Sequence, residues 1–76
     1  MNIQELQEAL EYAREQMFHA ELRLDQLTDP ELIDACIYEI RAWEIRFGYY
    51  NRKLKEAVAS GQALQRNGLV YFGGKR

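Results

Sequence analysis

The sequence has very little of the residues that build most active sites. Its 76 residues include one cysteine, one histidine and one proline. A single cysteine excludes an internal disulfide framework and is typical of a reducing compartment, so we expect a cytoplasmic protein. One histidine and one cysteine are too few for most metal sites and for most nucleophile–base pairs. We therefore expect no enzyme activity, and no metal or cofactor.

Long apolar runs are also missing. No run exceeds four residues, as in the segment 69–72, whereas a membrane-spanning helix needs about 20. The first residues, Met-Asn-Ile-Gln-Glu, are polar and acidic where a signal peptide would have a basic start and an apolar core. The sequence therefore predicts neither a membrane segment nor a secretory leader.

The charges are unevenly divided along the chain, although the net charge is only −2. Residues 1–38 contain nine acidic and two basic residues, which gives −7, and residues 39–76 contain eight basic and three acidic ones, which gives +5. The two halves could fold against each other, which we favour, or the basic half could meet an acidic partner. Hydrophobic residues make up 47% of the chain and charged residues 29%, as in an ordinary small globular domain.

Two rows of apolar residues dominate the sequence, and each repeats at alternating spacings of three and four. The first seam is Ile3, Leu6, Leu10, Ala13, Met17, Ala20, Leu24 and Leu27. The second seam is Ile33, Cys36, Ile40, Trp43, Phe47, Tyr50, Leu54 and Ala57. This spacing is typical of helices that pack as in a coiled coil. It predicts two helices of similar length, at about 2–27 and about 30–59, each about 38 Å long.

The segment Thr28–Glu31 separates the two seams. Asp29 is a suitable N-cap with Pro30 at the first helical position, and Thr28 with Glu31 could instead form a capping box. Either start leaves a short link, and a short link makes consecutive helices antiparallel neighbours. The sequence thus predicts an all-α fold, an antiparallel two-helix hairpin that resembles a coiled coil.

Antiparallel pairing can be examined on the sequence itself. If facing layers have residue numbers that sum to about 60, small residues repeatedly face large ones, as with Ala13 and Phe47. The same register brings Arg14 near Glu44 and Arg23 near Glu39, so we expect two ion pairs between the helices.

The helical spacing of apolar residues ends near Ala59, and the composition of the chain changes there. Ser60 and Gly61 indicate a glycine C-cap, and residues 61–76 form a glycine-containing tail. A turn dipeptide at 67–68 and the apolar segment 69–72 predict a short strand or hairpin within residues 63–72. This segment either folds back on the helices, which we favour, or docks on a partner.

Three features with possible chemistry have simpler explanations. Cys36 belongs to the second seam, so we expect it to be buried and unreactive. His19 has no second histidine at ligand spacing. The carboxylates at 5, 8, 11 and 15 recur at the spacing of a solvated helix face.

A second apolar row on the second helix has no such explanation. Tyr38, Ile45 and Tyr49 lie roughly opposite the second seam, and Ala42 widens the row. A weaker counterpart, Phe18 with Leu22, lies off the first seam. The row could be covered by the tail, by a second copy of the chain or by a different protein. We favour a homodimer that forms a four-helix bundle, because two helices alone bury little surface.

The sequence therefore predicts a protein that acts by binding another protein, as an adaptor or inhibitor. The expected contact residues are Tyr38, Ala42, Ile45 and Tyr49, with Tyr71 and Phe72 of the tail as auxiliaries.

A nucleic-acid-binding hairpin that uses Arg52, Lys53 and Lys55 is the alternative. The acidic first helix and a sequence pI near 5.3 argue against it.

Three segments together resemble the signature of the YaaL-like family, a group of short bacterial proteins of unknown function. They are Asp-Pro-Glu-Leu-Ile-Asp at 29–34, Ile-Tyr-Glu-Ile-Arg-Ala at 37–42 and Arg-Phe-x-Tyr at 46–49. The resemblance covers about residues 28–57 and implies a short, helical, cytoplasmic protein, with no activity or functional residues to carry over. Trp43 and the tail from Gly61 depart from the signature. A phage-encoded member of such a group would act as an inhibitor of a host machine.

Overall fold

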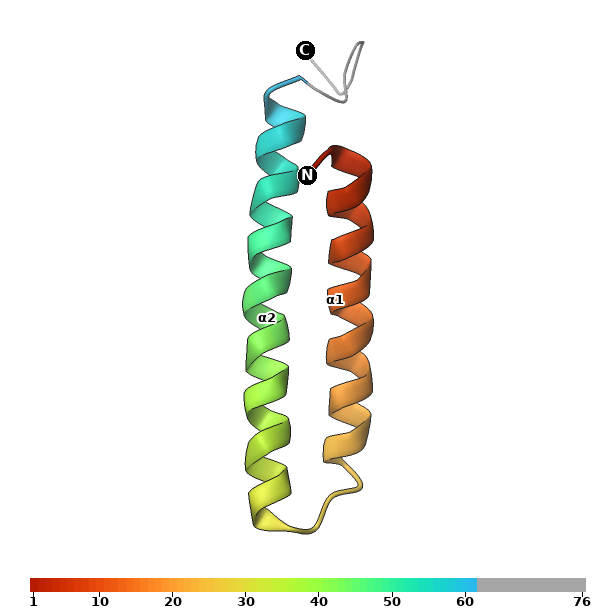
Figure 1. The fold of residues 1–76 in the computed structure, drawn as a ribbon, viewed down its shortest axis with the longest axis vertical. Coiled ribbons are helices and arrows are strands. Elements are labelled where there is room, and N and C mark those ends of the chain that lie inside the picture. Colours follow the sequence, from red (N-terminus) through yellow and green to blue (C-terminus); the bar gives the residue numbers. More distant parts are fainter. Residues whose placement is uncertain (62–76) are drawn as a thin grey trace.

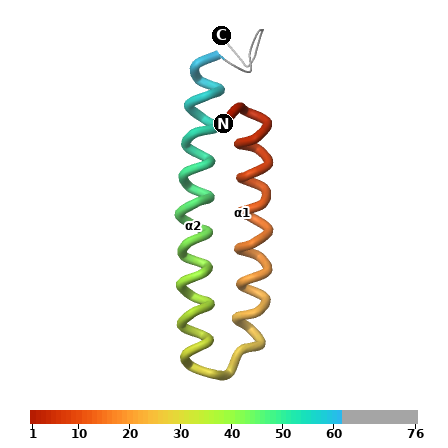
Figure 2. The backbone as a smooth tube through the Cα atoms, viewed as in Figure 1, coloured from red at the N-terminus to blue at the C-terminus, as the bar shows by residue number. Residues whose placement is uncertain are grey.

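The computed structural model describes residues 1–61. Within them, helices α1 (Ile3–Leu24) and α2 (Pro30–Ala59) run side by side in opposite directions (Figure 1). The predicted all-α antiparallel hairpin is therefore confirmed. The tube in Figure 2 shows that the N-terminus lies beside the last turns of α2, at the end of the hairpin opposite the connecting loop. The strand or hairpin predicted within residues 63–72 lies outside the described residues, as does the rest of the tail.

Helix α1 begins with a capping box. The Oδ1 atom of Asn2 accepts a hydrogen bond from the Glu5 backbone N–H (2.8 Å), and the Glu5 carboxylate accepts one from the Asn2 backbone N–H (2.9 Å). These bonds satisfy two backbone donors that have no partner inside the helix. The acidic side chain also lies near the positive end of the helix dipole, where negative charge is stabilising.

Helix α1 ends at Leu24, so the expected end near residue 27 is wrong, and the two helices differ in length by about two turns. The backbone N–H of Gln26 bonds to the Arg23 carbonyl (3.0 Å), and that of Leu27 bonds to the Leu24 carbonyl (3.2 Å). These short-range bonds form a tight turn. A two-residue link reaches only about 7 Å, whereas the axes of packed helices lie about 8–10 Å apart. The last predicted turn of α1 is therefore not helical, because its residues are needed to connect the two helices.

Helix α2 begins at Pro30, with Asp29 as its N-cap. The Asp29 Oδ1 atom accepts a hydrogen bond from the Glu31 backbone N–H at 2.9 Å, which decides between the two predicted starts in favour of Asp29. At its other end Ser60 is the C-cap, and Gly61 has a φ of 86°. A glycine adopts this left-handed conformation without steric penalty, so the predicted glycine cap is confirmed.

The two predicted seams form the interface between the helices, because all their residues are buried or half-buried. Among residues 1–61 only Leu6, Ala13, Ala20 and Cys36 are fully buried, and no large side chain in this range is completely enclosed. Small residues on α1 let the larger side chains of α2 pack closely against it. The hairpin therefore has a thin core.

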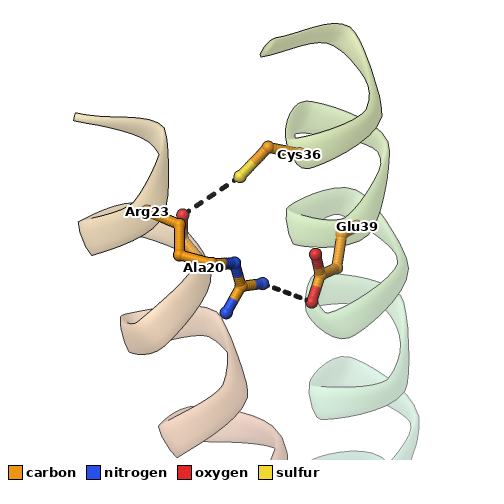
Figure 3. Close-up of polar contacts among 4 residues, drawn as sticks. All are labelled: Ala20, Arg23, Cys36 and Glu39. Atoms are coloured by element: carbon orange, nitrogen blue, oxygen red, sulfur yellow. Dashed lines mark hydrogen bonds and ion pairs between the residues drawn. The ribbon is translucent and has the colours of Figure 1, made fainter. Parts of the chain in front are cut away.

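Contacts between the helices fix their register (Figure 3). The Arg23 guanidinium bonds to the Glu39 carboxylate at 2.6 Å, as predicted, and the Cys36 thiol donates to the Ala20 carbonyl oxygen at 3.1 Å. The Arg23–Glu39 pair agrees with the predicted layering. The bond from Cys36 instead reaches Ala20, one turn away from Leu24, the residue that a sum of 60 places opposite Cys36.

The predicted pairing of Arg14 with Glu44 is wrong. Arg14 pairs with Glu11 on its own helix at 3.1 Å, and its guanidinium lies 5.9 Å from the ring centre of Phe47. Glu11 is one turn away and shares a face of α1 with Arg14, so this pair forms without reaching across the hairpin.

Candidate protein-binding surface

Three of the six large apolar side chains of α2 that are exposed lie on the side of the helix that faces away from α1. We call Tyr38, Ala42, Ile45 and Tyr49 the α2 stripe. The exposed fractions are 75% for Tyr38, 73% for Ile45 and 45% for Tyr49, and Ala42 is also exposed. At about 100° per residue these positions lie opposite the second seam. Tyr49 nevertheless lines a pocket together with Leu6 of α1. The predicted row is therefore a solvent-exposed surface of residues 1–61.

Basic side chains lie around Tyr49, the least exposed of the three large residues of the α2 stripe. The guanidinium of Arg52 lies 5.9 Å from the ring centre of Tyr49, and the ammonium of Lys53 lies 5.7 Å from it. The Tyr50 ring meets the Tyr49 ring edge-on, with centres 5.7 Å apart. These neighbours explain why Tyr49 is less exposed than Tyr38. Lys53 also pairs with Glu56 at 3.4 Å, so its charge is partly neutralised.

A shallow cleft borders the other end of the α2 stripe, lined by Asp34, Ile37, Tyr38 and Arg41. It places one acidic and one basic side chain beside two exposed apolar ones. Such a mixture is typical of the rim of a protein contact, where polar groups surround an apolar centre. The cleft is open to solvent and does not enclose a ligand.

Gly48 lies beside the α2 stripe and has no structural reason within the hairpin to be glycine. A Cβ atom added there would lie within 4 Å of no atom outside the neighbouring backbone of its own helix and its two chain neighbours, and the backbone keeps its helical conformation. Inside a helix, glycine is about 1 kcal/mol less favourable than alanine. The hairpin therefore has a small gap in its outer surface at a position where alanine would make the helix more stable.

An aromatic cluster that the seam spacing does not predict lies along one side of the hairpin. The ring of Tyr12 meets the ring of Trp43 edge-on at 5.6 Å, and the guanidinium of Arg46 lies 4.6 Å from the Trp43 ring centre. Tyr12 is outside the first seam, and its partner lies across the interface. Only the observed register brings the two rings together.

The outer side of α1 carries a smaller apolar surface. Phe18 and Leu22 are both exposed, one turn apart, and the His19 ring is 6.1 Å from that of Phe18. His19 is itself exposed. Two apolar residues among many charged ones are common on protein surfaces, so this pair is a weaker candidate than the α2 stripe.

The titratable groups of residues 1–61 do not gather into a metal-binding cluster. No group of three or more histidine, cysteine, aspartate or glutamate residues in this range could hold a metal ion. Cys36 is buried at the helix interface. The hydrogen bond that Arg23 donates to the Glu39 carboxylate raises the pKa of Arg23, and desolvation opposes this shift. Neither helix in this range is long and apolar enough to cross a membrane.

The remaining predicted contact residues, Tyr71 and Phe72, lie outside the described residues. Comparison of the chain with protein-family models, with curated proteins and with solved structures found no match. The resemblance of residues 28–57 to the YaaL-like family therefore stays a prediction.

Proposed function

We propose that this protein is a non-enzymatic binding protein that binds another protein chain through the α2 stripe. The observation that carries the proposal is the exposure of Tyr38 and Ile45, about three-quarters each, on the side of α2 that α1 cannot reach. Tyrosine is enriched in protein interfaces, because its ring buries a large area and its hydroxyl group tolerates water.

The thin core supports the same proposal. A chain of this size stabilises its fold mainly by removing apolar surface from water, and only four residues of the described hairpin are fully buried. Binding a second chain to the α2 stripe would add buried area and stabilise the folded state, since any ligand of the folded state alone does so. Function and stability would then depend on the same contact.

The proposal can be tested by placing a photoreactive phenylalanine analogue at single positions of the full chain in cells. At Ile45 we expect ultraviolet light to join the protein covalently to another protein chain. At Leu22, an exposed apolar residue on the outer side of α1, the same analogue is the matched control and should give little or no product.

Equal cross-linking at both positions, or none at Ile45, would contradict the proposal. Salt-sensitive binding of DNA or RNA that is lost on Arg52→Ala and Lys53→Ala would replace it with the alternative of a nucleic-acid-binding hairpin. Among residues 1–61 the net charge is −5, from seven basic and twelve acidic residues, which makes phosphate binding unfavourable.

A further inference from the structure

We infer that the partner of the α2 stripe is a second copy of this chain, bound with its α2 antiparallel to the first. The twofold axis would pass between Trp43 and Glu44. This inference rests on the proposed function and names the partner. It is carried by three observations: the spacing of the α2 stripe, the vacant surface at Gly48 and the order of charges along the outer side of α2.

A line of four residues spaced by seven runs along the outer side of α2: Glu31, Tyr38, Ile45 and Arg52. All four are exposed. Residues seven apart lie on nearly the same line of a helix, and in helix pairs such residues insert into holes formed by four residues of the facing helix. Antiparallel pairing about the proposed axis matches each member of this line with one hole on the copy.

The two central layers have an apolar side chain at their centre and one arginine at their edge. Ile45 inserts between Tyr38, Arg41, Ala42 and Ile45 of the copy, where Ala42 leaves room for its branched side chain. Tyr38 inserts between Ile45, Gly48, Tyr49 and Arg52 of the copy. The twofold axis makes each layer occur twice, so both Tyr38 rings and both Ile45 side chains become buried.

Gly48 lies on the floor of the hole that receives Tyr38. A Cβ atom at this position would meet nothing in the hairpin beyond the neighbouring backbone of its own helix and its two chain neighbours, so the packing of α1 against α2 does not explain the glycine. A glycine lets another chain approach the helix backbone closely, and a broad tyrosine ring needs that space. Packing against a second copy would explain why Gly48 is present although glycine makes the isolated helix less stable.

The charges at the two ends of the line are complementary in this arrangement. Arg52 inserts near Glu31 and Asp34 of the copy, and Glu31 inserts near Arg52 and Lys55 of the copy. A parallel arrangement would instead put each of these residues beside its own equivalent, and like charges that face each other are destabilising. The charge order therefore selects the antiparallel orientation.

The first test measures the mass of the full chain by light scattering, with helix content followed by circular dichroism. We expect twice the 9.0 kDa mass of one chain. Ile45→Asp and Gly48→Phe should each weaken dimerisation at least ~tenfold, the first through a buried charge and the second by filling the hole for Tyr38. Leu22→Asp, the matched control on α1, should remain a dimer. All three should keep their helix content, because these side chains lie outside the seams.

The orientation is tested with two cysteine variants in a Cys36→Ala background. When the Ala42→Cys chain and the Ile45→Cys chain are mixed and oxidised, we expect a disulfide between the two different chains. A disulfide between two copies of the Ala42→Cys chain would overturn the antiparallel register. Arg52→Glu should weaken the dimer, and adding Asp34→Arg to the same chain should restore it.

Different experimental results would overturn this inference and the proposed function. A monomer at all concentrations, cross-linked at Ile45 to a different protein, would overturn the homodimer and leave the proposed function in place. A monomer with no cross-link at Ile45 would overturn both. A dimer that Ile45→Asp and Gly48→Phe leave unchanged would place the contact on another face and overturn the inference.

Discussion

Replacing Ala13 with tryptophan is expected to destabilise the hairpin strongly. The Ala13 side chain is completely inaccessible to solvent and lies in the middle of the first seam. The predicted antiparallel layering places it opposite Phe47, one of the larger residues of the second seam. The substitution exchanges a methyl group for an indole at a point where the two helices already pack closely.

The size of the effect follows from how little the site can adapt. The helices would have to separate around Ala13, which would expose the neighbouring buried residues Leu6 and Ala20. Overpacking of a close-packed site costs about 1–3 kcal/mol. For a domain of this length each kcal/mol lowers Tm by about 4–8 °C, so we expect a decrease of at least about 4 °C.

The assay is thermal unfolding followed by circular dichroism, at a single protein concentration for every variant. Ala59→Trp is the matched control, because Ala59 is exposed at the end of α2 and has room for the larger side chain. We expect its Tm to stay close to that of the unmodified chain. If Ala13→Trp melts at the same temperature as Ala59→Trp, the proposed packing of the two seams is wrong.

Three further predictions concern single residues. Asp29→Ala should lower the free energy of unfolding by about 1 kcal/mol in urea titrations, because it removes the N-cap of α2, whereas Thr28→Ala should change it little; equal effects would contradict the assigned cap. The thiol of Cys36 should react with a thiol reagent much more slowly in the folded chain than in denaturant, since it is buried; equal rates would show that the interface is open. The folded-state pKa of Arg23 is raised, so its ion pair contributes fully below the unfolded pKa and is lost only as the pH rises through the folded value. The stability difference between the unmodified chain and Arg23→Gln should therefore be the same at about pH 6 and about pH 9, and a difference that shrinks over this range would refute the assignment.

The two ends of α2 could be predicted from the sequence, because they depend on neighbouring residues alone. The start of α2 at Pro30 and its end before Gly61 follow from cap chemistry that acts within one turn. The capping box of Asn2 and Glu5 has the same kind of signal, an N-cap residue followed three positions later by glutamate, and could have been predicted. The end of α1 had no such signal, because it is set by the distance the loop must cross.

Side-chain partners across the interface were harder to predict than the interface itself. The seam spacing implies which faces meet. However, Arg14 forms an ion pair with Glu11 on its own helix, and the Tyr12 ring contacts the Trp43 ring on the other helix. Long side chains have several reachable partners at similar free energy, and surface ion pairs are worth only about 0–1 kcal/mol. Sequence spacing alone cannot rank such weak alternatives.

The sequence by itself determined that the chain forms two helices, which faces of them meet and that they run antiparallel. These properties follow from the period of the apolar residues and from a short link, and both are local patterns. Only the tertiary structure decided where α1 ends, how thin the core is and that the rings of Tyr12 and Trp43 meet across the interface. The physical reason is that burial depends on the distance between the helices and on which side chains fill the space, and these quantities exist only once both helices are in place.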